Sequence, residues 1–282
     1  MGIDTIQVKS DTEAAIARAE APYISKTLTK DVDSSTVYYK LNPDKALNTQ
    51  IYDYGTYIEA VELMIDSLEL TNPVKTRIDF RVDSFGNNFN GLLKLNKLLI
   101  MLIAEQYKVN NRYETRDFIT LQELTVRIQK DRIEVENYNK AIEEPGGDVM
   151  NRLEFRSKKL YDDSAETAKE AREFTAWCDR LNKSVTGENF DRLQKKLTNI
   201  LVKEYRRVAQ DGVTVNQFLY KYESSVFTSR QMTEFYKQLG YKDPEQQAKK
   251  YKKRRNVEYY SMKNLTDYVN KIKCSGRNFF RV

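Results

Sequence analysis

Three short segments alternate apolar and polar residues, and their polar positions hold carboxylates, arginines and a tyrosine. The segments run from Thr76 to Asp83, from Ile133 to Lys140 and from Arg152 to Arg156. Because successive side chains of a strand point to opposite faces, each segment is expected to form a strand with one polar face. Those faces carry Arg77, Asp79, Arg81 and Asp83; Glu134, Glu136, Tyr138 and Lys140; and Arg152, Glu154 and Arg156. If the three strands share a sheet, carboxylates gather around a tyrosine.

Such a face has two interpretations. The structural one is a half-exposed sheet that shows its charges to water. The functional one is a metal-and-nucleophile site, because converging carboxylates repel one another unless a cation joins them. That cation could polarise a phosphoryl oxygen. The Tyr138 phenol, with an ordinary pKa of about 10, would need this ion or nearby Lys140 to ionise and attack a DNA phosphodiester.

The chain contains no histidine, and this restricts the chemistry. Its 282 residues include only two cysteines, Cys178 and Cys274, far apart in the sequence. Histidine-based acid–base catalysis, Ser-His-Asp triads and Cys- or His-ligated zinc sites are excluded. A metal would have to be held by carboxylates, carbonyls and water, which favours Mg²⁺ or Mn²⁺.

The spacing of apolar residues predicts an α+β fold: an antiparallel-rich sheet with helices on one face, followed by a helical, basic C-terminal domain. We expect an N-terminal arm over 1–34, a sheet domain over 35–160 and a helical domain over 161–282. The predicted elements besides the strands above are a strand at 37–41, helices at 57–70 and 90–107, a hairpin of 118–128 with 132–140, helices at 164–181, 188–208, 215–226, 228–239 and 243–255, a short strand at 257–261 and a helix at 264–272.

Positive charge is concentrated near the C-terminus. The net charge is +6, but residues 249–282 alone carry +9, which leaves about −3 on the rest. A basic segment on a near-neutral body is typical of proteins that bind a polyanion, although a solvated helix surface is the simpler alternative. The candidate phosphate contacts in this segment are Lys249, Lys250, Lys252, Lys253, Arg254 and Arg255. Helices 228–239 and 243–255 could form a helix-turn-helix-like pair with a long turn.

No membrane or secretory segment is expected. The longest apolar run, Leu98 to Ala104, is far shorter than the roughly 20 residues that cross a bilayer. The first ten residues have no secretory signal. Two distant cysteines indicate a reducing compartment, so a cytoplasmic protein is expected.

The chain resembles the rolling-circle replication initiators of Gram-positive plasmids and the related relaxases of conjugative elements and phage replication proteins. The segments Thr76–Asp83, Tyr138-Asn-Lys140 and Asn151–Arg156 carry the resemblance, in matching order and spacing, over roughly residues 37–160. It implies that Tyr138 is the nicking nucleophile and that Asp79 and Glu154, with Asp83 as a further candidate, bind the metal. That family is related to the His-hydrophobe-His endonucleases but lacks their histidines, as this chain does.

We therefore expect a metal-dependent enzyme that nicks one DNA strand at an origin and leaves a 5′-phosphotyrosine and a free 3′-hydroxyl. Arg77, Arg81, Arg152 and Arg156 would neutralise phosphates, and Lys140 would activate the phenol or orient the phosphate. The helical domain would recognise duplex origin DNA, with homodimerisation as a further candidate role. By resemblance, a host helicase would extend the opening.

Three alternatives compete with this expectation. They are a non-catalytic DNA-binding or regulatory protein on the same scaffold, a structural protein with a charged sheet, and a metal nuclease that uses water instead of tyrosine. One departure from the family's pattern keeps the first alternative open. Residues 134–137, just before Tyr138, include Glu134 and Glu136 where basic or hydroxyl residues are often found, so either Glu136 joins the metal shell or the site has lost activity.

Overall fold

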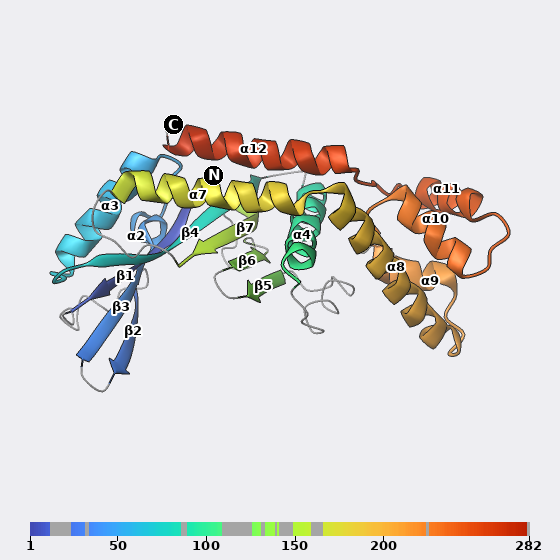
Figure 1. Ribbon diagram of the computed structural model, residues 1–282, viewed down its shortest axis with the longest axis horizontal. Helices are drawn as coiled ribbons and strands as arrows, with labels where there is room; N and C mark the ends of the chain where they lie inside the picture. The colour runs from blue at the N-terminus through green and yellow to red at the C-terminus, as the bar shows by residue number, and fades with distance from the viewer. Residues whose placement is uncertain are drawn as a thin grey trace.

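The computed structural model describes residues 1–11, 24–31, 34–85, 89–108, 126–130, 133–138, 140, 149–158, 166–223 and 226–280 (Figure 1). The strands are β1 (Gly2–Ser10), β2 (Ile24–Asp31), β3 (Ser34–Leu41), β4 (Val74–Phe85), β5 (Val126–Lys130), β6 (Ile133–Tyr138) and β7 (Val149–Ser157). The helices are α2 (Pro43–Leu47), α3 (Tyr54–Ser67), α4 (Phe89–Gln106), α7 (Glu166–Ser184), α8 (Gly187–Ala209), α9 (Val215–Tyr222), α10 (Ser229–Gln238), α11 (Pro244–Arg255) and α12 (Met262–Phe280). The predicted α+β class is confirmed.

The described strands form one seven-stranded sheet in the order β2-β3-β1-β4-β7-β6-β5, with every neighbouring pair antiparallel. The three strands singled out by their alternation are therefore adjacent, as β4, β7 and β6. The predicted hairpin is present as β5 and β6, although residues 118–125 of its first strand lie outside the described part of the chain.

One face of the sheet is apolar and is covered by helices that include α7 and α12. Phe80 of β4 packs against Phe174 of α7 and Phe280 of α12, with ring centres 5.7 and 6.3 Å apart. Phe155 of β7 packs against Trp177 of α7 at 5.2 Å. Figure 1 shows α7 and α12 running alongside each other across this face. The short helix α2 is an exception, because it contributes to the polar face.

The N-terminal segment differs from the predicted arm. Residues Gly2–Ser10 form a strand inside the sheet, between β3 and β4. Ile3 and Ile6 both belong to the apolar face, opposite Phe80 and Ile78, although they are three residues apart. A register irregularity between Ile3 and Thr5 makes this possible, since a β-bulge adds one residue to one strand. The bulge interrupts the alternation of buried and polar side chains, so the sequence pattern does not predict this strand.

Helices α8 to α11 extend away from the sheet (Figure 1). The predicted N-caps Thr228 and Asp243 are present, each accepting a hydrogen bond from a backbone N–H three residues on. Ser164, the predicted cap of the helix before them, lies outside the described residues. The short strand predicted at 257–261 does not form. The last helix is longer than predicted and returns along α7, where any side chain larger than glycine at Gly276 would collide with Phe174.

No helix in the described ranges is long and apolar enough to span a membrane.

Candidate active site

The polar faces of β4, β7 and β6 form three rows that run across the strands. Read in that strand order, the rows are Asp79, Arg156 and Glu134; Arg81, Glu154 and Glu136; and Asp83, Arg152 and Tyr138. The structure therefore brings together the tyrosine, the acids and the arginines that the alternation placed on one face. Opposite charges face each other in most of these positions, and directly opposed unlike charges stabilise antiparallel pairs.

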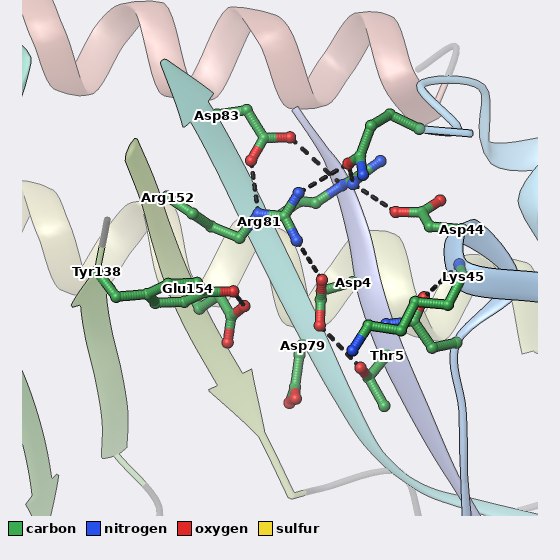
Figure 2. A network of polar contacts seen from close by, with 12 residues as sticks. Asp4, Thr5, Asp44, Lys45, Asp79, Arg81, Asp83, Tyr138, Arg152 and Glu154 are labelled. Atoms are coloured by element: carbon green, nitrogen blue, oxygen red, sulfur yellow. Dashed lines mark hydrogen bonds and ion pairs between the residues drawn. The ribbon is translucent and has the colours of Figure 1, made fainter. Parts of the chain in front are cut away.

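Tyr138 lies at the end of β6 and contacts Glu154 of the neighbouring strand (Figure 2). Its hydroxyl donates a hydrogen bond to Glu154 Oε1 at 2.5 Å. Burial, followed by the negative charge of Glu154, raises the pKa of Tyr138 well above its ordinary value, and only 8% of its surface is exposed. Burial, with Asp4 and Asp79 nearby, raises the pKa of Glu154 to about 8. The pair is thus a protonated phenol beside a carboxylate that binds protons unusually well.

Lys140 lies close to the same tyrosine. Its Nζ is 5.9 Å from the centre of the Tyr138 ring, and the residue is buried. The predicted proximity of Lys140 and Tyr138 is present. The ammonium group faces the aromatic ring, an arrangement that stabilises the cation.

Arg156 is the centre of the ion pairs on this face. Its guanidinium nitrogens lie 2.6 Å from Glu134, 2.8 Å from Glu136 and 3.0 Å from Glu154, and Nε lies 3.5 Å from Asp79. Burial acts to lower the pKa of Arg156, but Asp79 and Glu154 outweigh it and raise that pKa. Arg156 therefore pairs with four carboxylates at once, and Arg77 and Lys158 add positive charge beside Asp79 and Glu134.

Asp79 and Asp83, the other predicted metal ligands, are also paired with arginines. Both Asp79 oxygens accept hydrogen bonds from Arg77, at 2.7 and 2.6 Å. Asp83 accepts from Arg152 Nε at 2.6 Å and from the Tyr52 hydroxyl at 3.1 Å. Burial raises the pKa of Asp79 despite the bond to Arg77.

Arg81 and Arg152 are buried rather than available to DNA. Arg81 is fully buried, pairs with Asp44 of α2 and donates to the Ile51 carbonyl at 2.7 Å. Arg152 is 1% exposed and pairs with Asp4 of β1 as well as with Asp83 (Figure 2). Phosphate contact, as predicted for both, would require this network to open.

Arg152 and Arg81 also share a neutral partner, Gln50. Arg152 Nη2 donates to Gln50 Oε1 at 2.7 Å, and Arg81 donates to the same oxygen. In contrast to these two arginines, Arg77 and Arg156 keep 13% and 14% of their side chains exposed. Only these two of the four predicted phosphate contacts reach the surface.

The arrangement does not fit a divalent ion as it stands. In the ranges that the structure describes, no three Asp, Glu or Cys side chains are grouped so that they could hold a metal. Asp79, Asp83 and Glu154 each already bind a guanidinium group, so an entering cation would meet fixed positive charge. The arginines take the charge-neutralising role that the sequence suggested for a metal.

A buried chain of amide groups supports the Tyr138 end of β6 from behind. Asn151 Nδ2 donates to the Tyr138 carbonyl at 2.9 Å, and Asn96 Nδ2 of α4 donates to Asn151 Oδ1 at 2.8 Å and to Asn137 Oδ1 at 3.0 Å. The Tyr268 hydroxyl of α12 donates to Asn96 Oδ1 at 2.5 Å. The C-terminal helix is thereby connected to the backbone of Tyr138.

The sequence did not predict four parts of the contact network around this face: Asp4, Asp44, Gln50 and the Asn96–Asn151 amide contact. Asp4 lies within the bulge of β1, between Ile3 and Thr5, and Asp44 and Gln50 lie in and after a five-residue helix. None belongs to an extended periodic segment. Only the amide contact left a trace in the sequence: Asn96 is a polar residue on the otherwise apolar face of the predicted helix 90–107.

The predicted basic segment lies on α11. Lys249, Lys250, Lys252, Lys253, Arg254 and Arg255 are all exposed, whereas Ala248 and Tyr251 are buried against the rest of the helical part. Helices α10 and α11 pack against each other, joined by residues 239–243. The predicted helix pair is therefore present, with its positive charge directed to solvent.

Comparison with known proteins finds one distant structural match. No family model and no curated protein matches the chain. Among solved structures, the rolling circle replication initiator protein from Geobacillus stearothermophilus matches with 13% identity and a TM-score of 0.26, over 60% of this chain and 77% of that one. A superposition at that level supports no argument about function.

Proposed function

We propose that the protein nicks one strand of DNA by attack of Tyr138 on a phosphodiester, as in the initiation of rolling-circle replication. The observation that carries the proposal is the hydrogen bond from the Tyr138 hydroxyl to Glu154 at 2.5 Å. A nucleophile within hydrogen-bond reach of a base is the arrangement that nucleophilic catalysis needs. The resemblance of the three strand segments to replication initiators supports the same reading.

The reaction would proceed through residues of this face. The Tyr138 oxygen forms a bond to phosphorus, its proton passes to Glu154, and the bond from phosphorus to the 3′ oxygen breaks. The leaving 3′ oxygen takes up a proton from solvent water, which gives a free 3′-hydroxyl and a 5′-phosphotyrosine. Arg156 and Arg77, the partly exposed arginines, would pair with the phosphate charge. The same linkage can be reversed by attack of a 3′-hydroxyl.

Dependence on Mg²⁺ or Mn²⁺ is a separate prediction. Binding an ion among Asp79, Asp83 and Glu154 would require their arginine partners to move. Comparison of the reaction with added Mn²⁺ or Mg²⁺ and with EDTA tests this dependence.

The second candidate is a non-catalytic DNA-binding or regulatory protein on the same scaffold. It is favoured by the burial of Tyr138, because a phenol that is 8% exposed is poorly accessible to a DNA strand. It predicts salt-sensitive DNA binding without covalent attachment.

Covalent trapping separates the two candidates. The protein is incubated with single-stranded oligonucleotides and supercoiled DNA from its own gene neighbourhood, and the products are run on a denaturing gel. A protein–DNA band that disappears in Tyr138→Phe supports nicking. Binding without such a band, on all of these substrates, supports the second candidate.

A further inference from the structure

A cavity of about 170 Å³ lies between the start of α9, α10 and α11, far along the chain from Tyr138. Its wall includes Lys250 and Arg254 of α11, Tyr236 of α10 and Tyr241. Val215 and Asn216, the first two residues of α9, also line it. Every one of these groups offers a hydrogen-bond donor.

The two cations of the cavity are uncompensated. Lys250 and Arg254 are one helical turn apart, so they share a face of α11. Within the described ranges neither forms an ion pair with an acid. The nearby carboxylate, Glu223, is already engaged: it accepts from the Tyr251 hydroxyl at 2.6 Å and from Arg255 Nε at 3.2 Å. Arg255 is thus paired with an acid, whereas Lys250 and Arg254 are left to contact a ligand.

Two further features of the cavity favour an anion. The backbone N–H groups of Val215 and Asn216 have no acceptor within their helix, and a helix N-terminus carries partial positive charge. The side chain of Thr214, the N-cap, accepts a hydrogen bond from the backbone N–H of Gln217, the third residue of α9. It therefore leaves the N–H groups of Val215 and Asn216 available. Burial raises the pKa of Tyr236 to about 12, so its hydroxyl stays protonated and can donate.

We propose that this cavity binds a backbone phosphate of duplex DNA and so anchors the helical part of the protein on the duplex. Paired Lys and Arg side chains, two free backbone N–H groups and tyrosine hydroxyls together match the oxygens of a phosphodiester. The proposal deepens the DNA-binding part of the proposed function. It assigns two roles within the basic segment. Lys250 and Arg254 bind one phosphate in the cavity, whereas Lys249 and Lys253 belong to a positively charged surface that attracts DNA without a defined contact.

The division gives a matched test. Lys250→Gln with Arg254→Gln removes two charges from the cavity, and Lys249→Gln with Lys253→Gln removes two from an adjacent exposed face of the same helix, about 100° away. Binding to a short duplex of mixed sequence is measured by fluorescence anisotropy across a series of salt concentrations. The cavity variant is expected to lose at least about tenfold in affinity and about 1 from the slope of log K against log salt, because about one phosphate contact is lost. The control variant is expected to lose much less than this.

Equal losses in the two variants would overturn the proposal, since they would show general attraction only. Amide resonances of Val215 and Asn216 provide a second readout in the unmodified protein. They should shift saturably with duplex DNA. Saturation by inorganic phosphate alone, or displacement of DNA by polyglutamate at equal charge, would overturn the proposal in favour of a small phosphate compound or an acidic protein. Tyr138→Phe leaves the cavity intact and should bind the duplex with the affinity of the wild type, so duplex binding tests this proposal separately from the Tyr138 chemistry.

Discussion

The Tyr138 hydroxyl donates a hydrogen bond to Glu154 across neighbouring strands, at 2.5 Å. Both groups are buried, and burial raises the pKa of each. The phenol therefore keeps its proton until a base takes it at the moment of attack. Glu154, whose pKa is about 8, is placed to be that base when it is ionised, a state whose population rises as the pH approaches 8.

Glu154→Gln should reduce covalent attachment to DNA by about 10²- to 10⁴-fold, the usual contribution of a positioned base. Glu136→Gln is the matched control: it also removes a carboxylate that pairs with Arg156, but no hydrogen bond joins it to Tyr138. Rates of band formation on denaturing gels compare the two variants. Similar rates for both would show that Glu154 acts only through the charge of the cluster.

Asn151→Ala should destabilise the protein by about 1–3 kcal/mol, because it leaves the buried Tyr138 carbonyl without its donor. Tyr268→Phe removes the hydroxyl that binds Asn96 in the same chain of contacts and should cost about 1 kcal/mol. Urea unfolding of both single variants and the double variant measures their coupling. A double variant whose loss is the plain sum would show that the amide chain does not act as a unit.

Arg156→Met should lower the free energy of unfolding by about 3–5 kcal/mol, because it leaves buried carboxylates uncompensated. Arg207→Met is a suitable comparison, since Arg207 pairs with Glu204 at the solvent-exposed surface, where an ion pair contributes little to stability. Denaturant titration at neutral pH gives both values. If the two variants are equally stable, Arg156 is not the centre of the cluster.

Lys97 predicts a pH dependence that is separate from the active site. It is 3% exposed on α4, and burial lowers its pKa to about 8. Between about pH 8 and the ordinary lysine value of about 10.4, the unfolded chain holds a proton that the folded chain has released. Stability should therefore rise with pH across this window relative to Lys97→Met, by up to about 3 kcal/mol.

Unfolding free energies of the wild type and Lys97→Met, measured at several pH values, check the sign. Lys237→Met, which removes an exposed lysine from α10, should follow the wild type. A wild type that loses stability relative to Lys97→Met as pH rises would contradict the burial argument.

Periodic segments of the sequence were sufficient to predict the polar face. The alternation in β4, β6 and β7 gave the faces of Asp79, Tyr138 and Glu154, and the helical spacing gave α4 and α8 to within a few residues. The pairing partners required the structure, because a strand pattern does not say which strand lies next to it. β1 was missed since its bulge interrupts the alternation. The acids that pair with the buried arginines, Asp4 and Asp44, were also missed, because they lie in segments without a regular alternation of apolar and polar residues.

The most direct test of the central claim is covalent trapping with Tyr138→Phe beside the wild type. Both proteins are incubated with oligonucleotides and supercoiled DNA from the gene neighbourhood, with Mn²⁺ or Mg²⁺ and with EDTA, and resolved on a denaturing gel. The account predicts a denaturation-resistant protein–DNA band in the wild type, none in Tyr138→Phe, and unchanged duplex binding in both. Cleavage without a covalent band, or a band that persists in Tyr138→Phe, would contradict it.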